Sequence, residues 1–207
     1  MRAFYFAILG VLLAVPAAAL PINVALGKPV TITGDVGVIT CCWPDATVHP
    51  PAALDTIVDG ILLAGGTQWQ TGTVWWDEDA GVRLGHPGSA NNIIEIDLLG
   101  LFQVDSILIQ ADNNDEYVIN YRNQLGTWVP YAFFPASGAP GMQVRAGSVG
   151  AFVATAIRID ARAGDGFYSV SEFQATGSPV PEPGTLLLLG TGIGAAVARR
   201  RTRRATA

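Results

Sequence analysis

The sequence is poor in charged residues and in cysteine. Only 14% of its 207 residues are charged, against 50% hydrophobic residues, and the apolar excess is concentrated at the two ends. This composition excludes an intrinsically disordered chain, because such chains carry much charge and few apolar residues. The length leaves room for one ordinary domain.

Basic residues are scarce between the two ends. Once Arg2, the five tail arginines and Glu182 are set aside, six basic and sixteen acidic residues remain, so the central part of the chain carries a charge near −10. Binding to DNA, RNA or anionic lipid requires a basic face, and this balance argues against all three. It is compatible with cations or neutral sugars as partners, and equally with a role in solubility alone.

Residues 1–19 predict a secretory signal peptide. Arg2 precedes an apolar run at 3–15, and the small residues Ala17 and Ala19 follow it. The run is too short to cross a bilayer of about 30 Å comfortably as a helix, and it has no polar face of the kind that an amphipathic helix needs. We expect a signal helix that is cleaved after Ala19.

The last residues, 179–207, predict a sorting tail. A Pro-Glu-Pro motif precedes an apolar stretch at 184–198 and an arginine cluster, the residues being Pro181, Glu182, Pro183, Arg199, Arg200 and Arg201. Arginines beside an apolar helix stay in the cytoplasm, so the body of the protein is expected outside the inner membrane. The stretch would be roughly 22 Å long as a helix, which favours a temporary sorting helix over a permanent anchor.

This tail resembles the PEP-CTERM protein-sorting signal of Gram-negative bacteria in its motif, its apolar stretch and its terminal arginines. The resemblance implies recognition by an exosortase-type membrane transpeptidase, which cleaves near the motif. It also implies that the protein is held transiently in the inner membrane by its tail. The mature protein would then go to the cell surface, the outer envelope or the extracellular matrix.

Residues 20–178 have the periodicity of strands. Ile94, Ile96 and Leu98 alternate with Glu95 and Asp97, which is typical of a strand with one buried face. Further runs rich in β-forming residues lie at 104–109, 117–121, 156–160 and 169–175, with glycine-rich and proline-rich turn signals between them. No stretch sustains an amphipathic helical repeat over three turns. We therefore expect an all-β sandwich or jelly roll.

Seven segments of this body, in order, resemble the discoidin, or coagulation factor V/VIII type C, family. They are NVALGKPV at 23–30, VDG at 58–60, TQW at 67–69, NNIIEIDLLG at 91–100, YVINYRNQLGTWVPY at 117–131, AIRIDA at 156–161 and GDGFYSVSEF at 164–173. The resemblance implies a galactose-binding-like jelly-roll β-sandwich. Members of this family are mostly recognition modules for sugars, lipid head groups or proteins, and many bacterial relatives are carbohydrate-binding modules.

The resemblance further implies a structural calcium ion where the loop after the first strand approaches the last strand. The matching positions are Asp59, Thr67 and Glu172. Ca²⁺ takes about six to eight oxygen ligands, and a carboxylate beside a glycine turn supplies side-chain and backbone oxygens together. The alternative is that Asp59 only caps a turn and Glu172 lies on the surface. The segment ILLAGG at 61–66 replaces residues that are commonly polar in the family, so the middle ligands are not assigned.

Sugar-binding modules stack an aromatic ring on the apolar face of a pyranose, and Trp75 and Trp76 are the candidates. Adjacent residues of a strand face opposite ways, so we expect one in the core and one free. The polar loop containing Asn113 and Asn114 is placed at the same rim. The alternative is that both tryptophans are buried and the asparagines only form a turn. Packing roles are expected for the tryptophans inside the family segments, Trp69 and Trp128.

The only cysteines, Cys41 and Cys42, are neighbours. A disulfide between adjacent residues is strained, so an intermolecular disulfide or two free thiols fit better. A copper or zinc site with His49 would match no standard spacing. The sequence places no nucleophile beside a base and no pair of carboxylates across a cleft.

The sequence thus predicts a signal peptide at 1–19, a discoidin-like domain at 20–178 and a PEP-CTERM tail at 179–207. We expect an exported, non-catalytic recognition module that binds glycan or exopolysaccharide, with calcium bracing its fold. The alternatives are a structural scaffold of the surface or matrix and a small extracellular hydrolase. A fold alone does not decide between them.

Overall fold

A computed structural model describes residues 20–37, 49–78, 92–147, 150–181, Gly190, Gly192 and Ile193. The expected signal helix lies outside these residues. Of the expected sorting helix, only Gly190, Gly192 and Ile193 are described. Within the described residues, no helix combines the length and apolar character needed to span a membrane.

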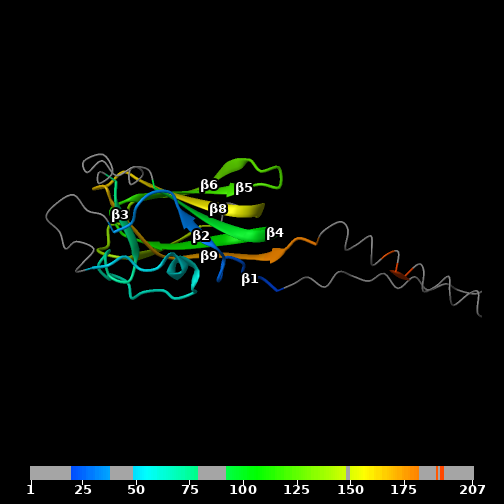
Figure 1. The fold of residues 1–207 in the computed structure, drawn as a ribbon, viewed down its shortest axis with the longest axis horizontal. Coiled ribbons are helices and arrows are strands. Elements are labelled where there is room, and N and C mark those ends of the chain that lie inside the picture. The colour runs from blue at the N-terminus through cyan, green and yellow to red at the C-terminus, as the bar shows by residue number, and fades with distance from the viewer. Residues whose placement is uncertain are drawn as a thin grey trace, which may run out of the picture.

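The described fold is built from antiparallel strands (Figure 1). They are β1 (Ile22–Asn23), β2 (Val30–Ile32), β3 (Val74–Asp77), β4 (Ile93–Ala111), β5 (Glu116–Arg122), β6 (Trp128–Phe134), β7 (Gln143–Gly147), β8 (Phe152–Arg162) and β9 (Phe167–Pro179). A short 3-10 helix, η1 (Leu54–Val58), lies between β2 and β3.

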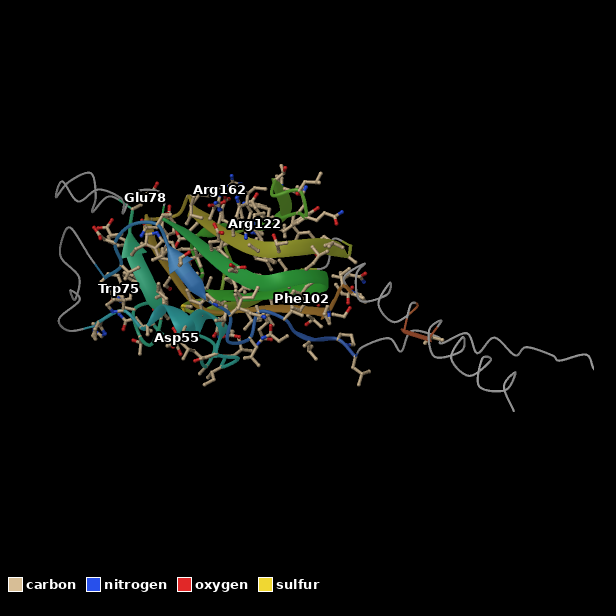
Figure 2. The ribbon with its side chains drawn as sticks, turned by 45° about the vertical axis from the view of Figure 1, so that its right-hand side comes forward. Asp55, Trp75, Glu78, Phe102, Arg122 and Arg162 are labelled. Carbon is tan, nitrogen blue, oxygen red and sulfur yellow. The ribbon has the colours of Figure 1, made fainter. Side chains whose placement is uncertain are left out.

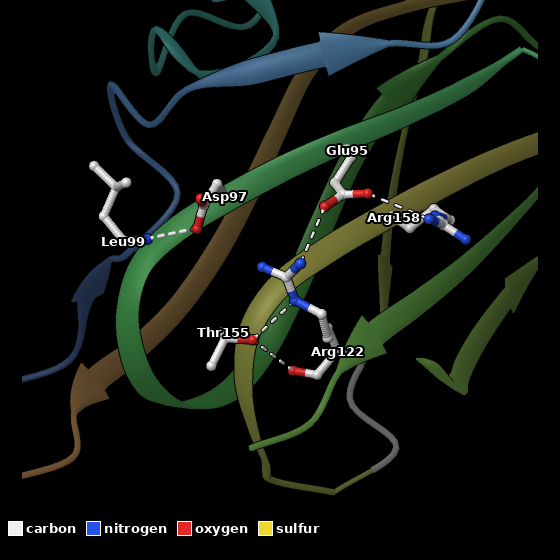
Figure 3. A network of polar contacts seen from close by, with 6 residues as sticks. All are labelled: Glu95, Asp97, Leu99, Arg122, Thr155 and Arg158. Carbon is white, nitrogen blue, oxygen red and sulfur yellow. Dashed lines mark hydrogen bonds and ion pairs between the residues drawn. The ribbon is translucent and has the colours of Figure 1, made fainter. Parts of the chain in front are cut away.

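Strand β4 organises the sandwich because its two halves have different partners. Its first half pairs with β2 and β8, and its second half pairs with β9 and β7, while β8 continues past the junction to pair with residues 102–104 as well. The halves meet at Leu99, whose φ of 57° lies in the left-handed region. There Asp97 Oδ1 accepts a hydrogen bond from the Leu99 N–H at 3.0 Å (Figure 3). Strands β5 and β6 extend the first group beyond β8, while β1 and β3 flank β9.

The core lies between these two groups of strands. Ile94, Ile96 and Leu98 of β4 are fully buried, as their alternation with charged residues predicts, and Phe173 of β9 is buried with them. Burying side chains of this size contributes about 1.5–3 kcal/mol each, which makes the alternating faces the main determinant of the register.

The two ends of the sandwich differ. Ile22 of β1 pairs with Gly177 near the end of β9, so the chain enters and leaves the described domain at one end. The turns at 112–115 and 163–166 lie at the opposite end, where β4 stops and β9 begins. Figure 2 shows Trp75 and Glu78 toward this second end and Phe102 toward the first. We call the second end the distal end.

Candidate functional site

The structure brings Glu172 and the Asp59 turn together. Glu172 of β9 is fully buried, and its Oε2 accepts a hydrogen bond from the Gly60 N–H at 3.2 Å. Its Oε1 has no hydrogen-bond partner among the described residues. Burial raises the pKa of Glu172 to about 7, and the nearby Asp59 carboxyl adds to this, while hydrogen bonding to Gln174 and Gly60 opposes it.

Asp59 lies directly after η1 and forms the turn itself. Its Oδ1 accepts a hydrogen bond from the Ile61 N–H at 2.8 Å, and Gly60 has a φ of 83° that favours glycine. The structure therefore supports part of each alternative. Asp59 caps a turn, and Glu172 is buried beneath that turn rather than exposed at the surface.

The loop after this turn is fixed to the sheet by Gln110 of β4. The Gln110 side chain donates to the Leu63 carbonyl and accepts from the Leu63 N–H, both at 2.8 Å. Ser171 of β9 donates to the same Gln110 Oε1 at 2.8 Å. The apolar loop at 61–66 is thus held by its backbone, which explains why it needs no polar side chains of its own.

Thr67 belongs to the same loop, but its hydrogen bonds run elsewhere. Its hydroxyl donates to the Ala64 carbonyl at 2.7 Å, and its carbonyl accepts from the Met142 N–H at 2.8 Å. Of the three expected calcium ligands, the structure joins only Asp59 and Glu172. Within the described part of the chain, no three His, Cys, Asp or Glu side chains form a metal cluster.

The expectation that one tryptophan of β3 would be free is wrong. Trp76 packs into the core, where its ring lies 5.7 Å from that of Tyr168. Trp75 faces the other way, as expected, but its exposed fraction is 0%. The Trp69 ring packs edge-on against the Trp75 ring at 5.5 Å. The Trp75 Nε1 donates to the His49 carbonyl at 3.0 Å. A second layer of loops therefore covers the outer face of β3.

The half-buried aromatic pair at the distal end is Trp69 and Phe167. Their ring centroids lie 5.7 Å apart with the planes at 39°, and both side chains keep part of their surface in water. The neighbouring Asp165 is exposed, and its Oδ1 accepts a hydrogen bond from the Phe167 N–H at 3.0 Å. Sequence reasoning assigned Trp69 only to packing. The sequence carried no signal for its partial exposure, because a half-buried tryptophan has the same sequence signature as a buried one.

Glu95 of β4, Arg122 of β5 and Arg158 of β8 form an ionic network (Figure 3). Trp128 of β6 packs against the two arginines of this network. The Arg158 guanidinium lies 4.0 Å from the centre of its ring. Glu95 pairs with both Arg158, at 3.3 Å, and Arg122, at 3.6 Å. Trp128 thus has the packing role expected of it.

The two asparagines form a turn at the distal end. The Asn113 carbonyl accepts a hydrogen bond from the Ser137 N–H at 2.6 Å, and its Oδ1 accepts from the Gly141 N–H at 3.1 Å. Both Asn113 and Asn114 are half-buried. Asn113 therefore braces a neighbouring loop as well as forming the turn.

The same turn buries a pair of carboxyl groups, Asp112 and Asp115; sequence reasoning placed Asp115 in the polar loop at the rim and did not predict that it is buried. Asp112 and Asp115 are 1% and 0% exposed, and the Tyr117 hydroxyl donates to Asp112. Arg145 donates to the main-chain carbonyls of both aspartates. Burial raises the pKa of both carboxyl groups, and the negative charge of Asp112 raises that of Asp115 further. The pair is therefore stable when it holds a proton.

Several expectations fall outside the described residues. These include Cys41, Cys42, Glu182, Pro183, Arg199, Arg200 and Arg201. Pro181 is described and exposed, and it follows a residue whose N–H is still bonded to the sheet, since Val180 donates to the Leu101 carbonyl at 2.9 Å.

The topology and the buried alternating faces define a discoidin-like, galactose-binding-like β-sandwich. The chain is similar in fold to a fucolectin from the serum of the striped bass Morone saxatilis, with a TM-score of 0.53 and 16% identity, over 80% of this chain and 52% of that one. It also matches the family 32 carbohydrate-binding module of Clostridium perfringens NanJ, solved with galactose, with a TM-score of 0.47 and 15% identity over 76% and 98% of the two chains. The fold expected from the sequence is confirmed.

A further match is to SpGH29, with a TM-score of 0.48 and 14% identity; it covers 77% of this chain but only 28% of that one. A search of curated protein sequences finds no relative of this chain. Residues 179–204 match the PEP-CTERM protein-sorting motif. The resemblance of the tail is thereby confirmed, and the motif implies an exported protein that is processed near its C-terminus.

Proposed function

We propose that this protein is an exported glycan-binding module that its tail directs to the cell surface or the extracellular matrix. The single observation that supports glycan binding best is the half-buried Trp69–Phe167 pair, which a discoidin-like sandwich presents at its distal end. This end is remote from both points at which the chain leaves the domain, so a tethered protein keeps it accessible.

The chemistry of this end suits a neutral sugar. A pyranose stacks its apolar face on an aromatic ring, and carboxylate oxygens accept hydrogen bonds from its hydroxyl groups. Trp69 and Phe167 supply the rings, and the exposed Asp165 supplies a carboxylate beside them. The charge near −10 of the body disfavours anionic polysaccharides, because like charges repel over about 10 Å at moderate salt.

The residues around Glu172 fit a bound calcium ion. A fully buried carboxylate oxygen without a partner is costly, and the adjoining Asp59 carboxyl adds a second negative charge. A divalent cation would neutralise both groups. Asp59 and Glu172 would hold it, together with main-chain oxygens of the 59–66 loop, and it would fix that loop on β9.

The test is a glycan panel that includes the host's own exopolysaccharide, probed with the folded domain in calcium and again with a chelator. We expect saturable binding in calcium, and loss of thermal stability with the chelator. A folded domain that binds no glycan in calcium would overturn the proposal. If such a domain also self-associates, the matrix scaffold becomes the better account.

A further inference from the structure

The sorting motif starts inside the folded domain. The matched segment begins at residue 179, and β9 ends at the same residue, Pro179. Val180 is bonded to the sheet through the Leu101 carbonyl, and Pro181 is the first proline of the Pro-Glu-Pro motif. No linker separates the sandwich from the motif.

The strand is locked just before this point. Ala175 and Asn23 are joined by a hydrogen bond from the Ala175 N–H to Asn23 Oδ1 at 3.1 Å, and the Val24 N–H donates to the Ala175 carbonyl at 2.7 Å. Gly177 pairs with Ile22 on one side and β4 on the other, and a Cβ at Gly177 would collide with the Gln103 carbonyl. Up to Gly177 the strand is therefore held on both sides.

The next three residues are held more weakly. Ser178 and Pro179 pair with Gln103 and Phe102 of β4 alone, and Pro179 has no N–H to donate. Ser178 and Val180 are half-buried, and Pro179 is exposed. This short end is a segment that opens locally while the rest of the domain stays folded.

A peptidase binds its substrate as an extended segment on both sides of the bond that it cleaves, and cleavage of a folded substrate follows the population of the opened form. We propose that the folded sandwich masks the residues ahead of the motif, so that processing waits for 178–180 to peel away from β4. The inference rests on the proposed function only in taking the tail as a processed sorting signal. The rate of processing therefore depends on local opening of the folded domain, and this opening extends back to Gly177 and no further.

The first test adds a linker to the full-length protein in cells that contain the processing enzyme. Four Gly and Ser residues are inserted between Val180 and Pro181, and the same four are inserted after Leu125, in the exposed β5–β6 turn, as the control. Pulse-chase labelling measures the rate of processing. Because about one or two backbone hydrogen bonds no longer need to break, we expect the first insertion to accelerate processing about tenfold or more. The control insertion leaves the rate unchanged, and equal rates for all three proteins would overturn the inference.

The second test closes the strand end. Gln103 and Ser178 are cross-strand partners, so the double variant Gln103→Cys/Ser178→Cys is placed to form a disulfide in an oxidising compartment. It is made together with Cys41→Ser and Cys42→Ser, and the two single-cysteine variants are its controls. We expect at least a tenfold slower processing that a thiol reductant restores. A locked protein that is processed as fast as its controls contradicts the inference.

The outcomes separate this inference from the function it rests on. If the unaltered chain is never processed, the proposed sorting role fails and the inference fails with it. If the chain is processed but neither variant changes the rate, the inference alone fails. Glycan binding is read out independently of both.

Discussion

The Glu172 carboxyl makes the stability of the domain depend on pH in a calculable direction. Its pKa is raised from 4.5 to about 7 in the folded protein, first by burial and then by Asp59. The folded state therefore binds this proton more tightly than the unfolded state does. The stability that it contributes is fully present below pH 4.5 and is lost as the pH rises through about 7.

The magnitude follows from the size of the shift. One pKa unit corresponds to about 1.4 kcal/mol, so a fully desolvated group would lose about 3 kcal/mol over this range. Asp59 and Gly60, which cover the carboxyl, are exposed to solvent, so screening reduces the expected loss to about 2 kcal/mol. In Glu172→Gln the side chain cannot ionise, and this loss should disappear.

The assay is urea unfolding of the wild type and of Glu172→Gln, in chelator, at several pH values across this range. Other carboxyl groups contribute to the slope of each protein, so the diagnostic quantity is the difference between wild type and Glu172→Gln. Calcium at about 100 times its dissociation constant should then add about 2.7 kcal/mol to the wild type at the alkaline end. Identical slopes in chelator would show that Glu172 does not cause this loss, and equal stabilisation of both proteins by calcium would show that Glu172 does not hold the ion.

Three further predictions concern the packing of the distal end and of β9. Gly177→Ala should lower the free energy of unfolding by about 2–3 kcal/mol, because the new Cβ collides with the Gln103 carbonyl. Urea unfolding measures this change, and unchanged stability would mean that β9 and β4 do not approach so closely. Asp115→Asn should make the stability of the domain less sensitive to alkaline pH. The pKa of Asp115 is raised in the folded protein, so the stability that this carboxyl contributes is lost as the pH rises through that pKa. Thermal melts of both proteins at neutral and alkaline pH measure this, and an equal fall in melting temperature for the two would contradict it. Asn113→Ala should lower the free energy of unfolding by about 1 kcal/mol, because the Gly141 N–H loses its acceptor, and it should leave glycan affinity unchanged. A denaturation curve measures the first effect, and a changed glycan affinity would mean that Asn113 contacts the glycan directly.

Local patterns in the sequence predicted the strands and the core. Ile94, Ile96 and Leu98 face inward because each alternate position of β4 faces the same way, and this holds whatever the topology. The same rule gave the directions of Trp75 and Trp76 correctly. The alternation of the strand could not predict that Trp75 is buried. Trp75 is covered by the loop that contains Trp69 and by the segment at His49, and neither belongs to the strand.

The candidate site was harder to predict from the sequence, because it is formed by contacts between segments that are far apart in the chain. Asp59 and Glu172 are far apart in the sequence, and only the resemblance to a family brought them together. The burial of Asp112 and Asp115 was invisible, because the sequence around them reads as a polar, exposed turn. The partial exposure of Trp69 was missed for a related reason, since a half-buried aromatic residue has the same sequence signature as a buried one.

The most direct test of glycan recognition compares two half-buried tryptophans that lie on different surfaces. A glycan that binds the wild type is titrated calorimetrically into Trp69→Ala and into Trp128→Ala, after thermal melts have shown that both are folded. We expect at least a tenfold loss of affinity in Trp69→Ala and wild-type affinity in Trp128→Ala. Unchanged binding by a folded Trp69→Ala would contradict the assignment of the distal end as the glycan site.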